Sequence, residues 1–486
     1  MSRFNRRKFL KTTAAASAVY PLFTVAGTKA SGNVVGANDT IRVGVAGIHG
    51  RGKSHYGDYA KMDKVDVSYL IDPDSSLFEA ATAAVKARGG NTATCVQDIR
   101  VALDDKNLDA VSVATCNHWH SLIGVWACQA GKDAYIEKPI SHNVFEGGKL
   151  AEAARKYNRI VQHGTQQRSS QGRAEQMAAI QAGKYGKVLV SKGYCCKPRW
   201  SIGSKPISKP PSHLDFNLWL GPAPKQDFHG NLVHYNWHWF WDTGNGDTGN
   251  QGVHEMDVAH WAIKGATMPN RIWSLGGRFI PGEENLRDQG QTPNMQLSVY
   301  EYDDTLLVFE TRGLVGKAGS PPRNVSNEVY TTEGVVKITE GKFYPNNGGK
   351  PEAIQGEPAT VTPGGPFGSF IASVRSRNAA GVNCDAQVGH YSSALCHLGN
   401  ISYRLGEPVP FNKQSKTLGD NAQVVAAFET LKDNLKAVDV NLAETDYTLG
   451  RVLEFDTKTE RFKGDDQANA LLGRPYRKPF VVPETV

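Results

Sequence analysis

Cysteine is scarce in this chain and forms no recognisable binding pattern. There are seven cysteines in 486 residues, an odd number, and no CxxC pair. This argues against a disulfide framework and a zinc ribbon. Three cysteines in or beside apolar runs are expected to be small core residues: Cys95, Cys116 and Cys128. The vicinal pair Cys195-Cys196 is expected to pack on a strand, with redox activity as the alternative.

Long apolar runs and a one-sided charge are missing from most of the chain. After residue 31 no segment approaches the ~18 apolar residues of a membrane-spanning helix, so no stable membrane span is predicted. The formal net charge is +7, but the first 31 residues hold six basic residues and no acidic one. The remainder is near neutral and has no basic stripe with interleaved aromatics, so no nucleic-acid partner is expected.

The N-terminus has the features of an export signal. Residues 5–11 read NRRKFLK, which matches the twin-arginine pattern, and a mild apolar stretch follows over residues 12–26. We therefore expect residues 1–31 to be a leader that the twin-arginine (Tat) machinery uses for export to the periplasm; the alternative is a basic N-terminal helix on a cytosolic protein. This route carries folded proteins, often with a cofactor bound, which favours a tightly bound cofactor.

From Thr40 onward the pattern alternates between short apolar runs and helical stretches. The runs expected to be strands are residues 41–46, 65–71, 110–114, 134–136 and 160–163, and helices are expected over residues 122–130 and 146–156. Repeated strand–helix–strand units predict an α/β fold with a doubly wound parallel sheet. The Rossmann domain is expected over residues 38–164.

The pattern changes after residue 165. Residues 198–252 are dense in Gly, Pro, Trp and Asn. Alternating runs at 271–275, 295–302, 305–311, 327–332 and 334–339 then predict a large, mostly antiparallel sheet in a second α/β domain over residues 165–420. Residues 343–366 are expected to be loop and residues 389–405 a helix. Residues 421–486 are expected to hold one helix, at 421–434, and an irregular wrapping tail.

A glycine-rich turn follows the first predicted strand. Gly47, Gly50 and Gly52 lie where the strand must turn sharply into a helix and the backbone must approach a pyrophosphate. Asp72 follows Gly52 by 20 residues, at the end of the second strand, where a carboxylate can accept hydrogen bonds from a ribose diol. The combination predicts a dinucleotide site.

The turn departs from the usual pattern at one position. In G-x-G-x-x-G counted from Gly47, the second glycine is replaced by His49, so either Gly50 makes the close approach or the phosphates sit differently. Asp72 favours NAD over NADP because it would repel a 2′-phosphate, and His49 or Arg51 could offset that repulsion.

Longer stretches resemble the glucose–fructose oxidoreductase, inositol dehydrogenase and MocA (Gfo/Idh/MocA) family. They are DAVSVATCNHWH at 109–120, AGKDAYIEKP at 130–139, WLGPAP at 219–224, GVHEMD at 252–257 and HLGNISYR at 397–404. The resemblance implies a cofactor in the cleft between two domains, a polyol or sugar substrate, and an EC 1.1-type activity. It also implies a homodimer or homotetramer through the open face of the C-terminal sheet.

The resemblance also implies catalytic roles. Lys138 would steady the developing oxyanion and relay a proton, with Glu137 orienting it by ion pairing. His254 would be the general acid/base, and Asp257, three residues on, would hold its tautomer. The family often has an aspartate four residues before that histidine, where this chain has Asn250. An asparagine can orient a hydroxyl but cannot accept a proton.

Further residues are expected to line the cofactor cleft. By the same resemblance Thr115, Asn117 and His120 would border the nicotinamide and ribose, together with Gln166. His118 and His120 would project from one side of an extended segment. No third ligand accompanies them, so no metal site is predicted.

Aromatic residues gather where a substrate would bind. Aromatic faces stack on the C–H faces of sugar rings while polar groups bind hydroxyls, so a carbohydrate site is favoured over an aromatic interdomain core. The expected substrate-binding residues are Arg199, Trp200, Tyr235, Trp237, Trp241, Asn245 and His254.

Three functions remain open at this point. The first is oxidation or reduction of a ring hydroxyl or keto group of a sugar, glycoside or polyol with NAD or NADP. The second is an NAD-dependent glycosidase that works by transient oxidation and elimination with a retained cofactor; the intact Lys138 argues modestly against it. The third is a non-catalytic carbohydrate-binding protein, which the intact Lys138, His254 and Asp257 disfavour.

Overall fold

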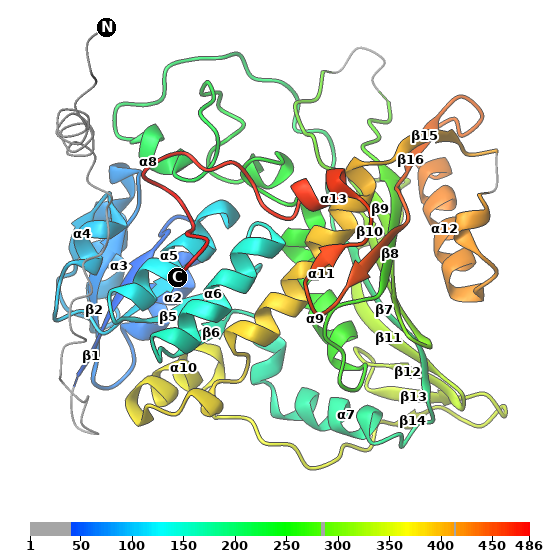
Figure 1. Cartoon of the computed structure of the whole chain (residues 1–486), viewed down its shortest axis with the longest axis horizontal. Coiled ribbons are helices and arrows are strands. Elements are labelled where there is room, and N and C mark those ends of the chain that lie inside the picture. Colours follow the sequence, from blue (N-terminus) through cyan, green and yellow to red (C-terminus); the bar gives the residue numbers. More distant parts are fainter. Residues whose placement is uncertain (1–39, 283–286, 413–414) are drawn as a thin grey trace, which may run out of the picture.

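The computed structural model describes residues 40–282, 287–412 and 415–486, which form two sheets with helices around them (Figure 1). The predicted leader, residues 1–31, lies outside these residues. Within the described ranges no helix is both long and apolar enough to cross a bilayer. The predicted α/β class, with a Rossmann sheet followed by a mostly antiparallel one, is confirmed.

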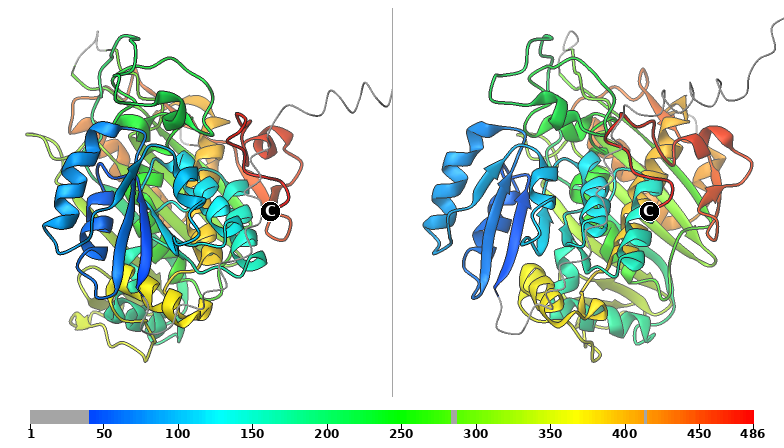
Figure 2. Two further views of the ribbon diagram at one scale, coloured as in Figure 1. Left: turned by 90° about the vertical axis from the view of Figure 1, so that its left-hand side faces the viewer. Right: turned by 60° about the vertical axis from the view of Figure 1, so that its left-hand side comes forward.

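The first sheet has six parallel strands in the order β3-β2-β1-β4-β5-β6 (Figure 2, left). The strands are β1 Ile41–Ala46, β2 Val65–Ile71, β3 Thr94–Val96, β4 Ala110–Val113, β5 Asp133–Ile136 and β6 Val161–His163. Strands β4 and β5 are buried throughout, as expected where helices cover both faces of a parallel sheet. Strand β3 is the only one of the six that the sequence patterns did not predict.

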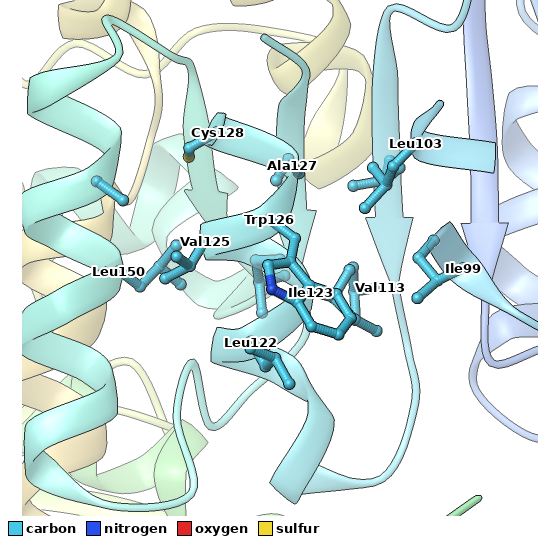
Figure 3. Close-up of a cluster of buried hydrophobic side chains, with 14 of the residues drawn as sticks. Ile99, Leu103, Val113, Leu122, Ile123, Val125, Trp126, Ala127, Cys128 and Leu150 are labelled. Atoms are coloured by element: carbon cyan, nitrogen blue, oxygen red, sulfur yellow. The ribbon is translucent and has the colours of Figure 1, made fainter. Parts of the chain in front are cut away.

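Helices cover this sheet. They are α2 Gly52–Tyr59, α3 Phe78–Lys86, α4 Ile99–Leu103, α5 His120–Gln129 and α6 Val144–Lys156. Helix α5 is buried along its length because it lies between the sheet and α6. Figure 3 shows its side chains Val125 and Trp126 between Val113 of β4 and Leu150 of α6, with Cys128 in the same cluster. Cys128 is therefore the core residue that the sequence predicted.

The second sheet has twelve strands, ten of them in the order β14-β13-β12-β11-β7-β10-β9-β8-β16-β15. Its strands are β7 Val188–Cys196, β8 Arg271–Gly277, β9 Met295–Tyr302, β10 Thr305–Arg312, β11 Asn324–Thr331, β12 Gly334–Lys337, β13 Lys342–Pro345, β14 Glu352–Ala353, β15 Glu407–Pro410, β16 Asp446–Leu449, β17 Leu453–Asp456 and β18 Arg461–Phe462. Only β7 and β10 pair in parallel among these described strands. The segment expected to be loop holds β14, and the tail expected to be irregular supplies β16 to β18.

Further helices follow along the described chain, and several of them pack on the second sheet. They are α7 Gln171–Gln181, α8 Phe216–Leu220, α9 Val253–Trp261, α10 Gly365–Ser376, α11 Ala386–Arg404, α12 Ala422–Lys436 and α13 Asp466–Ala470. Helices α9 and α11 cover the face toward the first sheet, and α12 covers part of the opposite face (Figure 1). The short 3₁₀ turns are η1 Ser75–Leu77, η2 Asn117–Trp119, η3 Gln166–Ser169, η4 Asn236–Trp239, η6 Ala379–Gly381 and η7 Lys416–Leu418, and η5 Thr248–Gly252 is a π-helical turn.

Two late segments return to the first sheet. Helix α10 inserts Phe367 and Phe370 into the cluster that holds the side chains of β1 and β2. The final segment, red in Figure 1, places Phe480 and Val482 against the cluster around α5. The core of the first sheet is thus completed by residues far along the chain.

Candidate active site

The glycine turn after β1 has room for a phosphate. Gly47 has a φ of +81°, and a Cβ there would lie 2.5 Å from the carbonyl oxygen of Ala114. A Cβ on Gly52 would lie 1.8 Å from the carbonyl oxygen of Gly47, whereas one on Gly50 would meet nothing within 4 Å. Helix α2 begins without a side-chain cap, and its N-terminus favours an anion, although the N–H groups of Lys53 and Ser54 already donate to the carbonyl oxygens of Gly50 and Arg51. The open space beside Gly50 leaves room for a phosphate at this residue.

A cavity of about 340 Å³ runs from this turn along the carboxyl ends of the strands. This is where ligands bind in open α/β sheets, and the volume is within the range of small-molecule sites. The predicted cofactor residues that line it are Gly47, His49, Gly50, Arg51, Asp72, Thr115, Asn117, His120, Glu137 and Lys138. Gly52 lies behind the turn, and Gln166 lies behind Glu137.

Asp72 lies at the end of β2 on the cavity wall. Its carboxylate accepts hydrogen bonds from the backbone N–H groups of Ile48, at 2.9 Å, and Asp74, at 3.0 Å. Burial raises the pKa of Asp72 to about 6, so it is mostly ionised at neutral pH. Nearby, the buried Oδ1 of Asn117 has no hydrogen-bond partner among the described residues. An acceptor at a strand end and an unpartnered amide oxygen in the same cavity fit a dinucleotide.

The segment from Gly203 to Asn245, here called the roof segment, covers the cavity (green in Figures 1 and 2). It pairs with the chain just after β2 through an antiparallel bridge between Asp74 and Leu214. The roof segment supplies six cavity-lining residues: Leu218, Trp219, His234, Tyr235, Trp237 and His238.

Side chains also fasten the roof segment at Asp74. The buried carboxylate of Asp74 lies 2.7 Å from Nδ1 of His213 and 2.9 Å from Nε2 of His234. Burial opposes ionisation, but hydrogen bonds from Ser76 and His213 outweigh it and lower the pKa of Asp74. His234 stacks on His49, with ring centroids 4.3 Å apart. The histidine that replaces the second glycine is thus part of the attachment of the roof segment.

Glu137 is buried, and one oxygen of its carboxylate contacts several neighbouring side chains. Its Oε1 accepts from Nε of Arg51, at 2.8 Å, and from Gln166, at 3.0 Å, and lies 3.2 Å from Nε2 of His55. Burial acts to raise the pKa of Glu137, but the hydrogen bond from His55 and the charges of Arg51 and Lys138 hold it well below its usual range. The predicted ion pair between Glu137 and the Lys138 ammonium is not formed; only the backbone N–H of Lys138 bonds to Glu137, at 3.2 Å.

The Lys138 ammonium reaches the π-helical turn η5 instead. Its Nζ donates to the carbonyl oxygen of Asn250 at 2.6 Å, and the side-chain amide of Asn250 donates to the hydroxyl of Tyr235 at 3.3 Å. All three residues line the cavity. Burial lowers the pKa of Lys138. π-helical turns are frequent at functional sites, so η5 is a candidate position for catalytic groups.

The predicted contact between His254 and Asp257 is absent. Both carboxylate oxygens of Asp257 bond to Nε of Arg168, at 2.9 and 3.0 Å, and Ser392 donates to one of them at 2.5 Å. His254 and Asp257 do not meet because the fully buried Asp257 side chain turns toward α11 rather than toward the cavity. His254 lies within the electrostatic reach of Lys138, and burial with that charge lowers the pKa of His254 to about 3.

Only part of the predicted substrate set borders the cavity. Tyr235 and Trp237 line it, joined by Trp219 and His238. The other predicted residues, His254 among them, do not line the cavity. Four of these are held elsewhere: Arg199 by an ion pair with Asp247 at 2.7 Å, Trp200 by a bond to the carbonyl of Val315, Trp241 under Arg404, and the main-chain oxygen of Asn245 by a bond from Asn400. Tryptophan and arginine residues in a dense loop thus divide between core and cavity.

His120, which lines the cavity, and the fully buried His118 each face carbonyl oxygens with both ring nitrogens. His120 faces the carbonyl oxygens of Pro139 and Thr115, at 2.6 and 3.0 Å. His118 faces those of Thr243 and Trp219, at 3.2 and 3.0 Å. These rings connect strand ends of the Rossmann sheet to each other and to the roof segment.

Buried histidines around the cavity are expected to make the fold acid-sensitive. Burial lowers the pKa of His118, His238 and His254 to about 3, whereas an imidazole in an unfolded chain titrates near ~6.5. Between these values the unfolded chain binds more protons, so the free energy of unfolding falls as the pH drops below about 6.5. Each histidine contributes up to ~1.4 kcal/mol per pH unit. Urea unfolding at neutral and mildly acidic pH measures the slope; equal stabilities would contradict it.

Comparisons with known proteins agree with this architecture. Residues 41–165 match a family model described as "Oxidoreductase family, NAD-binding Rossmann fold", and residues 181–273 match "Oxidoreductase family, C-terminal alpha/beta domain". A glycosyl hydrolase family 109 protein of Shewanella pealeana is 24% identical over 220 residues, covering 41% of this chain and 48% of that protein. This chain therefore spans about half the length of that relative.

Sugar dehydrogenases are among the other similar proteins. The levoglucosan dehydrogenase of Pseudarthrobacter phenanthrenivorans is 28% identical over 314 residues, covering 61% of this chain and 73% of that protein. A solved WlbA dehydrogenase from Bordetella pertussis, in complex with NADH and UDP-GlcNAcA, has a TM-score of 0.54 at 16% identity over 73% of this chain and 94% of that one. A levoglucosan dehydrogenase complex with NADH has a TM-score of 0.52 at 17% identity, over 74% and 96%.

At these identities the structural likeness shows the shared fold. Over residues 41–165 and 181–273 the chain is therefore similar to Gfo/Idh/MocA oxidoreductases.

Proposed function

We propose that this protein is an oxidoreductase that oxidises or reduces a ring hydroxyl or keto group of a sugar, glycoside or polyol with a tightly bound NAD or NADP. One observation carries the proposal: a single cavity joins the glycine turn and Asp72 to the aromatic residues Tyr235 and Trp237, with Lys138 between them. One end of the cavity fits a dinucleotide, and the other fits a ring with hydroxyl groups.

The residues present divide the chemistry among themselves. A bound nicotinamide supplies a hydride acceptor or donor. The turn at Gly50 and the start of α2 would hold the pyrophosphate, and Asp72 would accept from the ribose hydroxyls, which favours NAD. Lys138 would stabilise the oxyanion that develops as the alcohol proton leaves. The roof segment excludes water from the cleft.

The test begins with the nucleotide. The purified protein is denatured and the released small molecules are identified by mass spectrometry, and the protein is then offered glucose, methyl glucosides, N-acetylglucosamine, levoglucosan and inositol while nicotinamide absorbance is followed. We expect about one nucleotide per chain and an absorbance change with at least one sugar. A protein that neither holds nor binds a nicotinamide nucleotide would overturn the proposal.

A second candidate is an NAD-dependent glycosidase that oxidises a ring carbon, eliminates the aglycone and restores the cofactor. The similarity to glycosyl hydrolase family 109 proteins supports it. The same cavity would serve both reactions, so the products decide between them. Release of nitrophenol from a nitrophenyl glycoside, with no net change in NADH, would favour the glycosidase.

Export and assembly complete the proposal. The NRRKFLK stretch supports export by the Tat machinery to the periplasm, which cell fractionation with and without a functional Tat system tests. The part of the second sheet that α12 leaves uncovered supports a homodimer or homotetramer through this sheet. Light scattering of the purified protein measures the oligomeric state.

An Asp74→Ala variant is expected to release its nucleotide about tenfold faster or more. The substitution removes the carboxylate that fastens His213 and His234, and hydrogen bonds to a charged group contribute ~1.5–3 kcal/mol each. Nucleotide content during dialysis gives the half-time of release. Asp104→Asn, at the exposed end of α4, is the matched control. Equal half-times for wild type and Asp74→Ala would mean that the roof segment does not retain the cofactor.

A further inference from the structure

Of the residues predicted to be catalytic, Lys138 is the cation for the oxyanion, and the other three do not provide an acceptor for the substrate's hydroxyl proton; nor does the neighbouring Glu255. Asn250 carries an amide, which does not take a proton at neutral pH. Asp257 points away from the cavity toward α11. His254 is a weak base, because burial lowers its pKa to about 3. Glu255 accepts from the amide of Gln251, at 3.2 and 3.3 Å, and does not line the cavity.

Tyr235 is more exposed than these groups, and its hydroxyl oxygen accepts a hydrogen bond. Its side chain borders the cavity and is 53% exposed, so a ligand can reach the hydroxyl. The amide nitrogen of Asn250 donates to this hydroxyl at 3.3 Å and also lies 3.4 Å from Oδ1 of Asp247. A carboxylate only accepts, so Asp247 fixes the amide with its NH₂ group toward the phenol. The phenolic hydrogen is therefore free to point into the cavity.

We propose that Tyr235 exchanges the proton of the substrate hydroxyl and that Asn250 positions it for this purpose. The inference rests on the proposed function. In the oxidation, the C–H bond of the alcohol breaks and its electron pair leaves with the hydrogen as hydride to the nicotinamide. For this step the phenol of Tyr235 first gives its own proton to solvent, which reaches the hydroxyl because the side chain is 53% exposed. The O–H bond of the alcohol then breaks, its proton passes to the phenolate oxygen, and a C=O group is left. In the reduction, the phenol returns this proton to the carbonyl oxygen as hydride adds to carbon.

Lys138 and Tyr235 are linked through one residue. The ammonium of Lys138 bonds to the main-chain oxygen of Asn250, and the phenol of Tyr235 bonds to its side chain. Asn250 thus sets the positions of a cation for the oxyanion and a hydroxyl for the proton. The guanidinium of Arg199 also interacts electrostatically with Tyr235, although it does not reach the cavity.

The same geometry explains why an amide suits position 250. An aspartate there would accept the phenolic hydrogen instead of donating to the phenolic oxygen. The hydrogen of Tyr235 would then point away from the substrate. Asparagine keeps it available, and its N–H stabilises the phenolate formed when the hydrogen leaves.

The test removes the hydroxyl and keeps the ring. With the best substrate of the sugar panel, Tyr235→Phe is expected to lower kcat by about 100-fold to 10,000-fold, the usual range for loss of a general acid or base. The Kd of that sugar, measured by quenching of tryptophan fluorescence, should change less than about threefold, and the nucleotide content should not change. Tyr344→Phe, on β13 with its hydroxyl on Glu340, is the matched control.

The Asn250→Asp variant is a second test, and this substitution is not expected to disturb the fold. It is expected to lower kcat at neutral pH and to recover part of the loss at acidic pH, where a protonated carboxyl can donate to the phenol again. A kcat of Tyr235→Phe within about threefold of wild type, or a raised KM with kcat retained, would overturn the role of Tyr235. If the wild-type protein itself holds no nucleotide and converts no sugar, the proposed function and this inference are both overturned.

Discussion

A Lys138→Met variant is expected to lose at least about a thousandfold in kcat while it keeps its nucleotide. Lys138 is the cation of the cavity wall that reaches η5, and its ammonium lies on the carbonyl oxygen of Asn250 at 2.6 Å. Loss of a single oxyanion donor costs ~10²–10³ in kcat. Loss of the contact with Asn250, which also bonds to Tyr235, adds to it. Methionine fills similar space without charge, so the cavity should keep its shape.

The measurement separates chemistry from binding. Nucleotide content and sugar Kd should stay near the wild-type values, because the pyrophosphate and ribose contacts expected at Gly50 and Asp72 do not involve the ammonium. Lys458→Met, an exposed lysine between β17 and β18, serves as control. A kcat within tenfold of wild type would remove Lys138 from the mechanism and leave the fold assignment untouched.

An Asp257→Asn variant is expected to lose about 3–5 kcal/mol of unfolding free energy. Its carboxylate is fully buried and neutralises Arg168, whose side chain is only 10% exposed. Removing one partner of a buried ion pair leaves the other charge uncompensated, and losses of ~3–5 kcal/mol are typical. Because folded proteins have only ~5–15 kcal/mol to lose, this is a large fraction of the total.

Urea unfolding gives the free energy, and two further variants identify its cause. Asp63→Asn changes an exposed carboxylate and should cost less than ~0.5 kcal/mol. The double variant Arg168→Met with Asp257→Leu removes both charges and should recover most of the loss. If the double variant is as unstable as Asp257→Asn alone, the destabilisation comes from packing rather than from the unpaired Arg168.

The patterns that predicted the fold were those with a local physical cause. Apolar runs of four to seven residues found β1 and β2 at their observed bounds, and period-two alternation found β9 at its observed bounds. Strand β3 escaped because Thr94-Cys95-Val96 is too short and too polar at its start to stand out. The tail strands β16 and β17 escaped because they pair with β8, about 170 to 180 positions earlier, which no local pattern encodes. Strand β18 has only two residues and pairs with β17.

The candidate site, like the fold, could be predicted only where its residues follow from a local pattern. Gly47, Asp72 and Lys138 follow from strand ends, which a parallel sheet brings to one edge. The contacts of the roof segment were not predictable, since His213 and His234 have no spacing that ties them to Asp74. Helical spacing places Asp257 on the same face as His254, three residues before it, and therefore predicted a contact between them. In the structure the carboxylate binds the buried Arg168 from another element instead.

The insertion of α10 into the first sheet has a consequence for how the protein is made. Phe367 contacts His55 and Tyr135, and the guanidinium of Arg51 lies over its ring. A ribosome must therefore synthesise some 200 residues beyond the last Rossmann strand before the pocket around Glu137 is complete. Until then the nascent chain exposes the apolar surface that α10 later covers, which invites chaperone binding. If the protein binds a nucleotide, we therefore expect capture only after α10 has been synthesised, and we expect residues 40–165 produced alone to aggregate rather than bind a dinucleotide.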